Sequence, residues 1–531
     1  MKKRLGHLPD QGFLGSTQGS RFQFSSFDRV DLLDWGTPPP EPNLSAKTPN
    51  LFLDPQSREP VYLQIAHALM HEIHRSRMKP GDPLPGYRVL GVRLGVSRNT
   101  VMAAYHQLQA EGWVVSTPGE GSVVAPNPPT QIPGETVKSE PPGPATSMGF
   151  DLSPGIETEV RKGSSSLLKV ASGLPDPRLL PGAELARAYR RALVLNRQQN
   201  LELEDPQGHP MLRNSLARML RDSRGIKASP ENILVTRGSQ MALFLVAQAL
   251  LAPGDAVAVE ALGQSGAWEA FARAGARCLP VPLDKEGLRV AALDQLAQSE
   301  RLRAVFVTPL RQYPTLVPLS PERRERLMAL AESRRFAVIE NDQDSEFLFE
   351  GRPRAPLAAE DPAGVVIHVG TLSKIFSPNL RLGYVHGPVP LIARMRALRQ
   401  ALDRQGDMVL ERAFAELLDD GDIHRHLNRM QLTYRTRRDV LCRALQRSLG
   451  KYLSFRVPEG GLALWVKVKE GVDVDRWAAR ALEHGVAFQP GRRFAFDGGP
   501  VQYLRLGFSN YPESDLEEVA LRMCAALEED R

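Results

Sequence analysis

The sequence predicts a small α+β unit, followed by a large α/β domain that ends in a smaller α+β lobe. A Pro-rich, polar stretch at 126–163 separates two regions with regular apolar patterns and is typical of a linker. In the second region, short apolar runs alternate with helix-length stretches, which favours a largely parallel sheet covered by helices. After about residue 395 long charged helices and two further apolar runs follow, and these predict the smaller lobe.

The composition is that of a globular chain long enough for two or three domains. Hydrophobic residues make up 42% and charged residues 24% of its 531 residues. The net charge of +6 permits a polyanionic partner but does not by itself indicate one. The three cysteines are isolated in the sequence, so neither a disulfide framework nor a metal-ligand spacing is present. No apolar stretch is long enough to cross a bilayer, and we expect a cytoplasmic protein without a membrane partner.

The domain boundaries follow from these changes in pattern. The N-terminal region contains TPPPEPN and lacks a hydrophobic period, which predicts a disordered arm. The expected division of the chain is a disordered arm at 1–53, a first compact unit at 54–125, a linker at 126–163 and a second domain at 164–531. Within the second domain we expect a large lobe at about 180–395 and a small lobe at about 396–531.

The first unit has the pattern of a winged helix-turn-helix. Its opening stretch, PVYLQIAHALMHEIHRS, spaces four apolar residues four apart on one face of a helix: Val61, Ile65, Leu69 and Ile73. Residues 84–125 then contain a short helix, Gly95 at a turn, Ser97 as an N-cap, a second helix, and two β-rich pieces joined by TPGEG.

The second helix of this unit carries polar residues at its start. Val101, Ala104 and Leu108 are expected to face the core. Arg88 and Arg93, on the preceding helix, are expected on the same face as that start, where side chains enter a major groove. The residues left exposed there are Arg98, Asn99 and Thr100. Any other small helical domain is the alternative, because a helix-turn-helix pattern alone is a weak signal.

This stretch resembles the GntR-type winged helix over its full length, in LP(x)2R, LGVSRNTV, AY(x)2L(x)2EG and a wing of the form G(x)G. The resemblance implies that Arg88, Arg98 and Thr100 contact phosphates or base edges of double-stranded DNA. It also implies a minor-groove approach by the wing. The predicted DNA-binding residues are Arg88, Ser97, Arg98, Asn99, Thr100, Gly119 and Gly121. Gly86 and Tyr87 depart from the family, which usually carries small hydroxylated residues there.

Five apolar runs predict the strands of the second domain, and they lie at 233–236, 256–260, 303–309, 336–340 and 365–370. Most of them are separated by helix-length stretches at 239–252, 264–275 and 321–334. This order is typical of an α/β domain with a largely parallel sheet.

A lysine follows the last of these strands, in VGTLSKIFSPNLRLGY at 369–384. An ammonium is costly to bury without a partner, so lysines at buried strand ends often have lowered pKa values and form Schiff bases. Lys374 is therefore a candidate Schiff-base residue. A surface lysine in a loop is the alternative.

A second candidate site combines a helix start with an arginine. Gly238, Ser239 and Gln240 lie between a strand and a helix, where backbone N–H groups can bind a phosphate. Arg381 could supply a fixed positive charge to the same anion. A phosphate site together with a Schiff-base lysine indicates pyridoxal phosphate.

Residues 54–531 resemble the MocR subfamily of GntR regulators, in which the winged helix is fused to a fold-type I aminotransferase-like domain. The resemblance implies a homodimer with a cofactor pocket between subunits, and pyridoxal phosphate or its adduct with an amino compound as the signal. By position, it implies that Lys374 binds the cofactor aldehyde and that Arg505 binds the carboxylate of an effector. The implied phosphate-binding residues are Ser239, Gln240, Ser373 and Arg381.

Several positions depart from the family. Where the family shows EDDYDSEF, this chain reads ENDQDSEF at 340–347. Asn341 replaces the Asp that pairs with the pyridine nitrogen, and Gln343 replaces the Tyr that bonds the phenolic oxygen. Three other positions also differ: Gln264 replaces an aromatic residue of the family, Leu203 replaces a tyrosine, and Arg311 replaces a histidine.

These departures make transamination improbable, since an amide cannot stabilise a protonated pyridine nitrogen as a carboxylate does. We therefore expect a DNA-binding transcriptional regulator that is not an enzyme, whose aminotransferase-like domain dimerises and senses a small-molecule effector. One alternative is an active pyridoxal-phosphate aminotransferase with an accessory winged helix. The other is a regulator that binds no cofactor and has a remodelled pocket.

Overall fold

The computed structural model describes residues 51–54, 57, 59–117, 121–129, 150, 167–171, 173–194 and 205–528. The arm expected at 1–53 lies outside the described residues except for 51–53, and so does the linker expected at 126–163 except for 126–129 and 150. The chain divides into two compact units, residues 1–158 and 159–531, each of which is described by itself.

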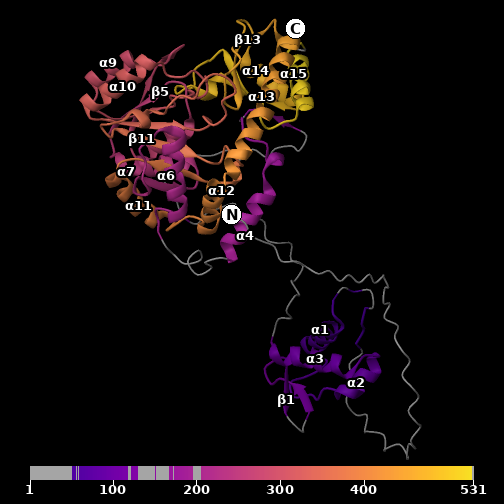
Figure 1. The fold of residues 1–531 in the computed structure, drawn as a ribbon. Helices are drawn as coiled ribbons and strands as arrows, with labels where there is room; N and C mark the ends of the chain where they lie inside the picture. Colours follow the sequence, from indigo (N-terminus) through magenta and orange to yellow (C-terminus); the bar gives the residue numbers. More distant parts are fainter. Residues whose placement is uncertain are drawn as a thin grey trace, which may run out of the picture. The chain divides into compact units, whose positions relative to one another are not determined.

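The first unit contains three helices and a two-stranded wing (Figure 1). Helix α1 spans Val61–His74, α2 Tyr87–Leu94 and α3 Arg98–Ala110. Strands β1 (Val114–Thr117) and β2 (Gly121–Val124) pair antiparallel. The winged helix-turn-helix predicted from the sequence is confirmed.

The core of this unit follows the predicted apolar spacing with one exception. Ile65, Leu69, Val101 and Leu108 are fully buried and pack in one cluster. Val61, the first residue of α1, is 42% exposed, so the apolar stripe begins one turn later than expected.

A seven-stranded sheet forms the centre of the second unit, in the order β4-β12-β11-β10-β9-β5-β6. Its strands are β4 (Ile233–Thr236), β5 (Ala256–Glu260), β6 (Arg277–Val281), β9 (Leu302–Val307), β10 (Ala337–Asp342), β11 (Val366–Thr371) and β12 (Gly383–His386). All five predicted runs are strands. Among the described pairs, β12 pairs antiparallel with β11 and with β4, and the other pairs of this sheet are parallel. The α/β fold is therefore confirmed, with a mixed sheet.

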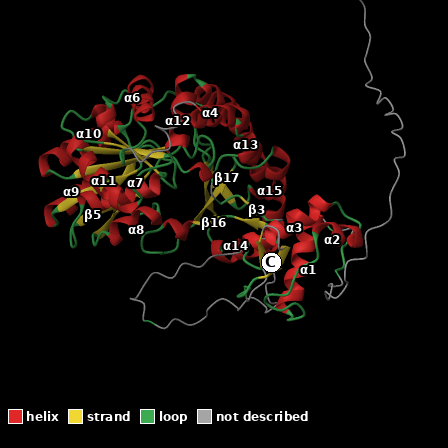
Figure 2. Ribbon diagram, turned by 90° about the horizontal axis from the view of Figure 1, so that it is seen from below, coloured by secondary structure: helices red, strands yellow, loops and turns green. Residues whose placement is uncertain are grey.

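Helices cover both faces of this sheet (Figure 2). One face packs against α7 (Ser239–Leu250), α8 (Ser265–Arg273) and α11 (Val389–Leu402). The other face packs against α9 (Val290–Ser299) and α10 (Pro321–Arg334). Between β5 and α9, the short strands β7 (Leu283–Asp284) and β8 (Gly287–Leu288) form a hairpin.

The smaller lobe has an antiparallel sheet in the order β13-β14-β17-β16. These strands span Leu453–Phe455, Ala463–Val468, Tyr503–Gly507 and Gln489–Pro490. Three helices pack in its core: α13 (Asp422–Leu449), α14 (Val474–Glu483) and α15 (Glu513–Glu528). Strand β3 (Leu168–Lys169) also joins this lobe, because it pairs with β15 (Val486–Ala487).

The large lobe extends beyond the boundary expected at about residue 395. Helix α12 (Met408–Asp419) packs against α4 (Gly182–Val194) and α6 (Pro210–Arg224). Apolar residues from all three helices share one core with β4. This core reaches Ile423, in the first turn of α13, so that long helix connects the two lobes.

Across the described residues, no helix combines the length and apolarity that a membrane span needs. The same part of the chain contains no group of three or more His, Cys, Asp or Glu residues arranged to hold a metal ion.

Candidate functional site

The start of α3 is held by a local cap. The Ser97 hydroxyl oxygen accepts the Thr100 N–H at 3.1 Å, and the two hydroxyl oxygens lie 2.8 Å apart. Such a cap satisfies one of the N–H groups that lack a partner within the helix. Arg98 and Asn99 are exposed beside it, and Thr100 is half-buried. The predicted DNA-binding residues of α3 are therefore brought together at one helix end.

Helix α2 lies very close to the turn before α3. A Cβ on Gly91 would lie 3.0 Å from the Val96 carbonyl oxygen, so this contact needs a small residue. The Tyr105 hydroxyl donates to the Pro85 carbonyl at 2.8 Å and fixes α3 to the segment before α2. Arg88 is exposed on α2. The two helices are thus fixed relative to each other by buried contacts.

The wing is described only in part. Gly121 begins β2 with a φ of 99°, which lies in the left-handed region that favours glycine. Gly119, the other wing residue predicted to approach DNA, lies outside the described residues.

The second candidate site lies at the carboxyl ends of β10 and β11. These parallel strands place Asn341 opposite Val369, and Lys374 follows three residues after β11 ends. Ligands of open α/β sheets bind at this edge. Burial lowers the pKa of Lys374 to about 8; Arg505 acts in the same direction and Asp344 opposes it. At this pKa about one tenth of the lysine is the neutral, nucleophilic amine at pH 7, far more than for an unperturbed lysine.

An anion cradle lies at the N-terminus of α7. Gly238, the residue before this helix, has a φ of 81°. A Cβ there would lie 3.0 Å from the Arg381 guanidinium, which donates to the Arg237 carbonyl at 3.0 Å. Glycine thus allows Arg381 to lie beside the first-turn N–H groups of Ser239 and Gln240, an arrangement that suits a phosphate.

Two residues of the predicted phosphate site have protein partners for their side chains. The Ser373 hydroxyl lies 3.3 Å from both the carbonyl oxygen and the N–H of Leu382. The Gln240 amide donates to the Gly266 carbonyl at 2.7 Å and connects α7 to α8. Ser373 therefore fixes the turn that carries Lys374, and Gln240 has its backbone N–H to offer a ligand.

The position expected for the pyridine nitrogen is occupied by a buried amide. Asn341 is 3% exposed, and its Nδ2 donates to Gln264 Oε1 at 3.0 Å. Its Oδ1 is buried and has no hydrogen-bond partner among the described residues. Two of the positions that depart from the family are thus in direct contact, which the sequence did not indicate. Gln343 lies beside Asn341 in a small polar pocket that Arg505 also lines.

Asp342 does not replace the missing carboxylate. Its Oδ2 lies 3.6 Å from Arg224, which also binds Glu346 at 2.6 Å. Burial acts to raise the pKa of Asp342, but Arg224 and His368 outweigh it and the pKa is lowered. Adjacent residues of a strand point to opposite faces of the sheet, so the side chain of Asp342 points away from that of Asn341. Its carboxylate is paired with Arg224.

Arg505 lies deep in the same pocket. It is 1% exposed, donates to the Ala171 carbonyl at 3.2 Å, and places its guanidinium carbon 4.8 Å from the Tyr313 ring centre. Its Nε is buried without a hydrogen-bond partner among the described residues. Unpaired buried donors are costly, so this group is suited to a ligand acceptor.

Sequence reasoning missed the residue that holds the loop carrying Arg311 and Tyr313. Glu260 is buried and accepts hydrogen bonds from the Thr308 hydroxyl at 2.7 Å and from the Gln312 amide at 3.2 Å. Burial raises its pKa to about 7. An acid at the end of the apolar run AVAVE was the available signal for this residue.

The residues present fit pyridoxal phosphate. Lys374 supplies a half-buried amine of lowered pKa for an aldehyde, and the Gly238 cradle with Arg381 suits a phosphate. Asn341 Oδ1 and Arg505 Nε are buried polar atoms without a partner in the described part of the chain, as expected where a polar ligand binds.

Comparisons with known proteins match both units. Residues 61–124 match the family of bacterial regulatory proteins called the gntR family, and residues 171–523 match aminotransferase class I and II. Among solved structures, the fold resembles LysN, the alpha-aminoadipate aminotransferase of Thermus thermophilus, which was complexed with N-(5'-phosphopyridoxyl)-L-leucine. The TM-score is 0.64 at 31% identity, over 69% of this chain and 93% of LysN.

Two regulators match along nearly their whole length. The HTH-type transcriptional regulator TauR of Rhodobacter capsulatus is 31% identical over 486 residues, which are 90% of this chain and 99% of TauR. The probable rhizopine catabolism regulatory protein MocR of Rhizobium meliloti is 29% identical over 471 residues, 88% of this chain and 94% of that protein. The chain therefore belongs to the MocR-type regulators of the GntR family, in which a helix-turn-helix domain is joined to an aminotransferase-like domain.

Proposed function

We propose that this MocR-type transcriptional regulator uses its aminotransferase-like domain to sense an amino compound through pyridoxal phosphate, without catalysing transamination. The observation that carries the proposal is the hydrogen-bonded amide pair of Asn341 and Gln264, in a chain that retains the half-buried Lys374 with its lowered pKa. Lys374 favours covalent binding of pyridoxal phosphate, and the amide pair disfavours transamination by the bound cofactor.

The chemistry of the two groups explains this division. Pyridoxal phosphate supplies an aldehyde that condenses with amines and a ring that withdraws electrons when its nitrogen is protonated. A carboxylate at the ring nitrogen adds a charge-assisted hydrogen bond of about 1.5–3 kcal/mol, which Asn341 does not provide. Asn341 can still accept or donate one neutral hydrogen bond, so binding is weakened more modestly than catalysis.

Three other residues would hold the ligand. Arg381 and the α7 N-terminus supply positive charge for a phosphate, and Arg505 supplies a guanidinium for the carboxylate of an amino compound. Gln343 could donate or accept at the phenolic oxygen. In this scheme the residues bind and orient, and none moves a proton from the substrate carbon.

The DNA-binding part of the proposal depends on the first unit. Exposed Arg88, Arg98 and Asn99 beside the capped start of α3 suit a major groove of operator DNA. We infer a homodimer, because two copies of the helix would read two half-sites of operator DNA. Since the proposed partner is DNA inside the cell, we also propose a cytoplasmic location.

A second candidate function is an active aminotransferase that carries a DNA-binding domain. The presence of Lys374, Arg381 and Arg505 favours it, as does the 33% identity over 367 residues to the 2-aminoadipate transaminase of Thermus thermophilus. The Asn341–Gln264 pair argues against it. A third possibility, a regulator that binds no cofactor, is favoured only by the same amide pair.

One absorbance experiment separates these possibilities. Purified protein is titrated with pyridoxal phosphate, and the visible band of the lysine-bound cofactor is recorded for wild type and Lys374→Ala. We expect a band in wild type that Lys374→Ala lacks, a shift of that band with amino compounds, and no keto acid product. Steady keto acid formation would favour the aminotransferase, and absence of any band with intact operator binding would favour the cofactor-free regulator.

A further inference from the structure

A wide groove adjoins the small polar pocket of Arg505. It has a volume of about 690 Å³, and it shares Leu310, Arg311, Leu316 and Ser345 with that pocket. Any ligand seated at Arg505 with a side chain directed past Arg311 would therefore extend into the groove.

The groove is strongly cationic. Seven of its lining residues are Lys or Arg and two are Glu. Both acids are already paired with arginines: Glu286 lies 3.4 Å from Arg323, and Glu459 lies 3.1 Å from Arg456. Glu459 thus neutralises Arg456 within the groove, and Arg224 and Arg311 have acidic partners outside its lining. In the described chain no ion pair engages the other four cations, which are Lys285, Arg352, Arg354 and Lys467, so the groove keeps a positive charge.

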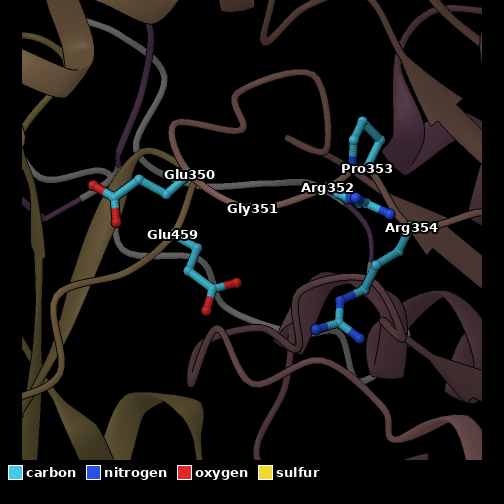
Figure 3. Close-up of a pocket in the computed structure, with 6 residues that line it drawn as sticks. All are labelled: Glu350, Gly351, Arg352, Pro353, Arg354 and Glu459. Carbon is cyan, nitrogen blue, oxygen red and sulfur yellow. The ribbon is translucent and has the colours of Figure 1, made fainter.

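Two of the cations, Arg352 and Arg354, lie on one short loop. Figure 3 shows a pocket that shares Arg352, Pro353, Arg354 and Glu459 with the groove, and in it the two arginines lie across from Glu350 and Glu459. Glu350 is engaged by Arg438 at 2.8 Å. Within the described chain, neither Arg352 nor Arg354 has an acidic side chain within ion-pair distance, and both are exposed.

This loop is anchored at both ends. Before it, the N–H groups of Phe349 and Glu350 donate to the Glu459 carbonyl at 2.8 and 3.1 Å. After it, the Leu357 N–H donates to buried Glu340 at 2.7 Å, and Arg324 donates to the Ala355 carbonyl at 2.7 Å. Pro353 further limits the backbone between the two arginines. The pair is thus presented on a fixed segment, which reduces the entropy lost on binding an anion.

The groove also has an apolar wall. Trp465 stacks on Tyr503 with ring centres 5.1 Å apart and planes at 5°, and both line the groove. Methylene groups of a ligand can pack on this aromatic surface, while an acidic end reaches the arginines.

We propose that the effector is an amino acid with a second carboxylate at the end of its side chain, and that this carboxylate binds in the groove near Arg311, Arg352 and Arg354. The proposal rests on the proposed function, because it assumes that the effector's amino group condenses with the cofactor aldehyde in place of Lys374 and that its α-carboxylate binds at Arg505. Beyond the proposed function, it names the chemical class of effector that the groove selects.

The first test compares acidic and neutral ligands of the same length. Calorimetric titration of the full-length protein loaded with pyridoxal phosphate is carried out with 2-aminoadipate and with norleucine, which has a methyl group in place of the second carboxylate. Exposed ion pairs are individually weak, but two arginines acting together lead us to expect about tenfold tighter binding of 2-aminoadipate. Glutamate and aspartate show whether side-chain length matters.

The second test changes the groove alone. Arg352→Ala/Arg354→Ala is expected to reduce the preference for 2-aminoadipate to within about twofold, with norleucine affinity unchanged. Arg352→Glu/Arg354→Glu is expected to favour ornithine or lysine instead. The matched control is Arg301→Ala/Arg334→Ala, which removes two exposed arginines that do not line the groove. All four positions are exposed, so the fold should be retained, and circular dichroism checks this.

The outcomes separate the two proposals. If wild type binds norleucine and 2-aminoadipate equally, the inference about the groove is wrong and the proposed sensor function stands. If no amino acid binds at all, the sensor function itself is wrong. If the preference exists but survives the loss of both arginines, the second carboxylate binds elsewhere and the groove assignment is overturned.

Discussion

The start of α3 and the pocket at the ends of β10 and β11 present their functional side chains in opposite ways. Arg98 and Asn99 are exposed and follow one another in sequence. The helix start that carries them is capped by the hydrogen bond between the Thr100 N–H and the Ser97 hydroxyl. In the pocket, Asn341 and Arg505 are almost fully buried and come from strands of different sheets. The first site can be altered without disturbing a core, whereas any change in the second alters the balance of buried polar groups.

One of the two largest expected effects is on DNA binding. Arg98→Ala should lower operator affinity by about 1–3 kcal/mol if the guanidinium reads a base edge. Because Arg98 is exposed, stability and pyridoxal phosphate binding should stay unchanged. Fluorescence anisotropy with operator DNA measures the effect, and Arg75→Ala, at the exposed residue just after α1, is the control. An equal loss in both variants would mean that the charge acts nonspecifically and that α3 has no special role.

The next expected effect is on pyridoxal phosphate binding at the buried Asn341 position. Asn341→Asp should tighten pyridoxal phosphate binding by about 1.5–3 kcal/mol, since a carboxylate can pair with a protonated ring nitrogen. It should also allow slow turnover of amino donors. Without the cofactor the same variant should be less stable, because the new charge is buried.

The control for this change is Asn214→Asp on the exposed surface of α6. Cofactor affinity is read from the absorbance titration, and stability from thermal unfolding. Weaker cofactor binding by Asn341→Asp would contradict the assignment of this position to the ring nitrogen.

A third prediction concerns the pH dependence of cofactor capture. The pKa of Lys374 is lowered to about 8 by burial, so its neutral form grows as pH rises through 8. The observed rate of band formation should therefore rise about tenfold from pH 7 to pH 9 and then level off. Stopped-flow absorbance follows the rate. A rate that still rises steeply above pH 9.5 would indicate an ordinary exposed lysine.

The same depressed pKa affects the stability of the cofactor-free protein. A lysine whose folded pKa lies below its unfolded pKa destabilises the fold while it is charged. This cost is full below pH 8 and is relieved between pH 8 and the unfolded value of 10.5. Lys374→Met should remove that dependence, which a pH series of denaturant unfolding can detect.

The smallest expected effect comes from removing the N-cap of α3. Ser97→Ala should destabilise the winged helix by about 1 kcal/mol, because the Thr100 N–H loses its partner. Denaturant unfolding measures the loss, and Ser97→Asp, which can also cap the helix, should restore most of it. If Ser97→Ala changes DNA affinity and leaves stability unchanged, the hydroxyl contacts DNA and is not needed for the cap.

Much of the fold was predictable because its signals are local. The five apolar runs became strands, and α10 spans the expected 321–334. Strand β12 was not predicted, since GYVH is short and pairs antiparallel through contacts with β11 and β4. The end of the large lobe was also misplaced, because the packing of α12 on α4 and α6 joins segments about 200 residues apart.

The sequence by itself determined the family motifs, the capped start of α3, the lysine after β11 and the replacement of two catalytic residue types by Asn341 and Gln343. Only the tertiary structure decided which partners these residues contact. It paired Asn341 with Gln264, committed Asp342 to Arg224, and opened the pocket of Arg505 onto a groove with Arg352 and Arg354. The physical reason is range: caps and strand patterns are set by neighbours in the chain, whereas burial, charge pairing and cavities depend on segments that meet only after folding.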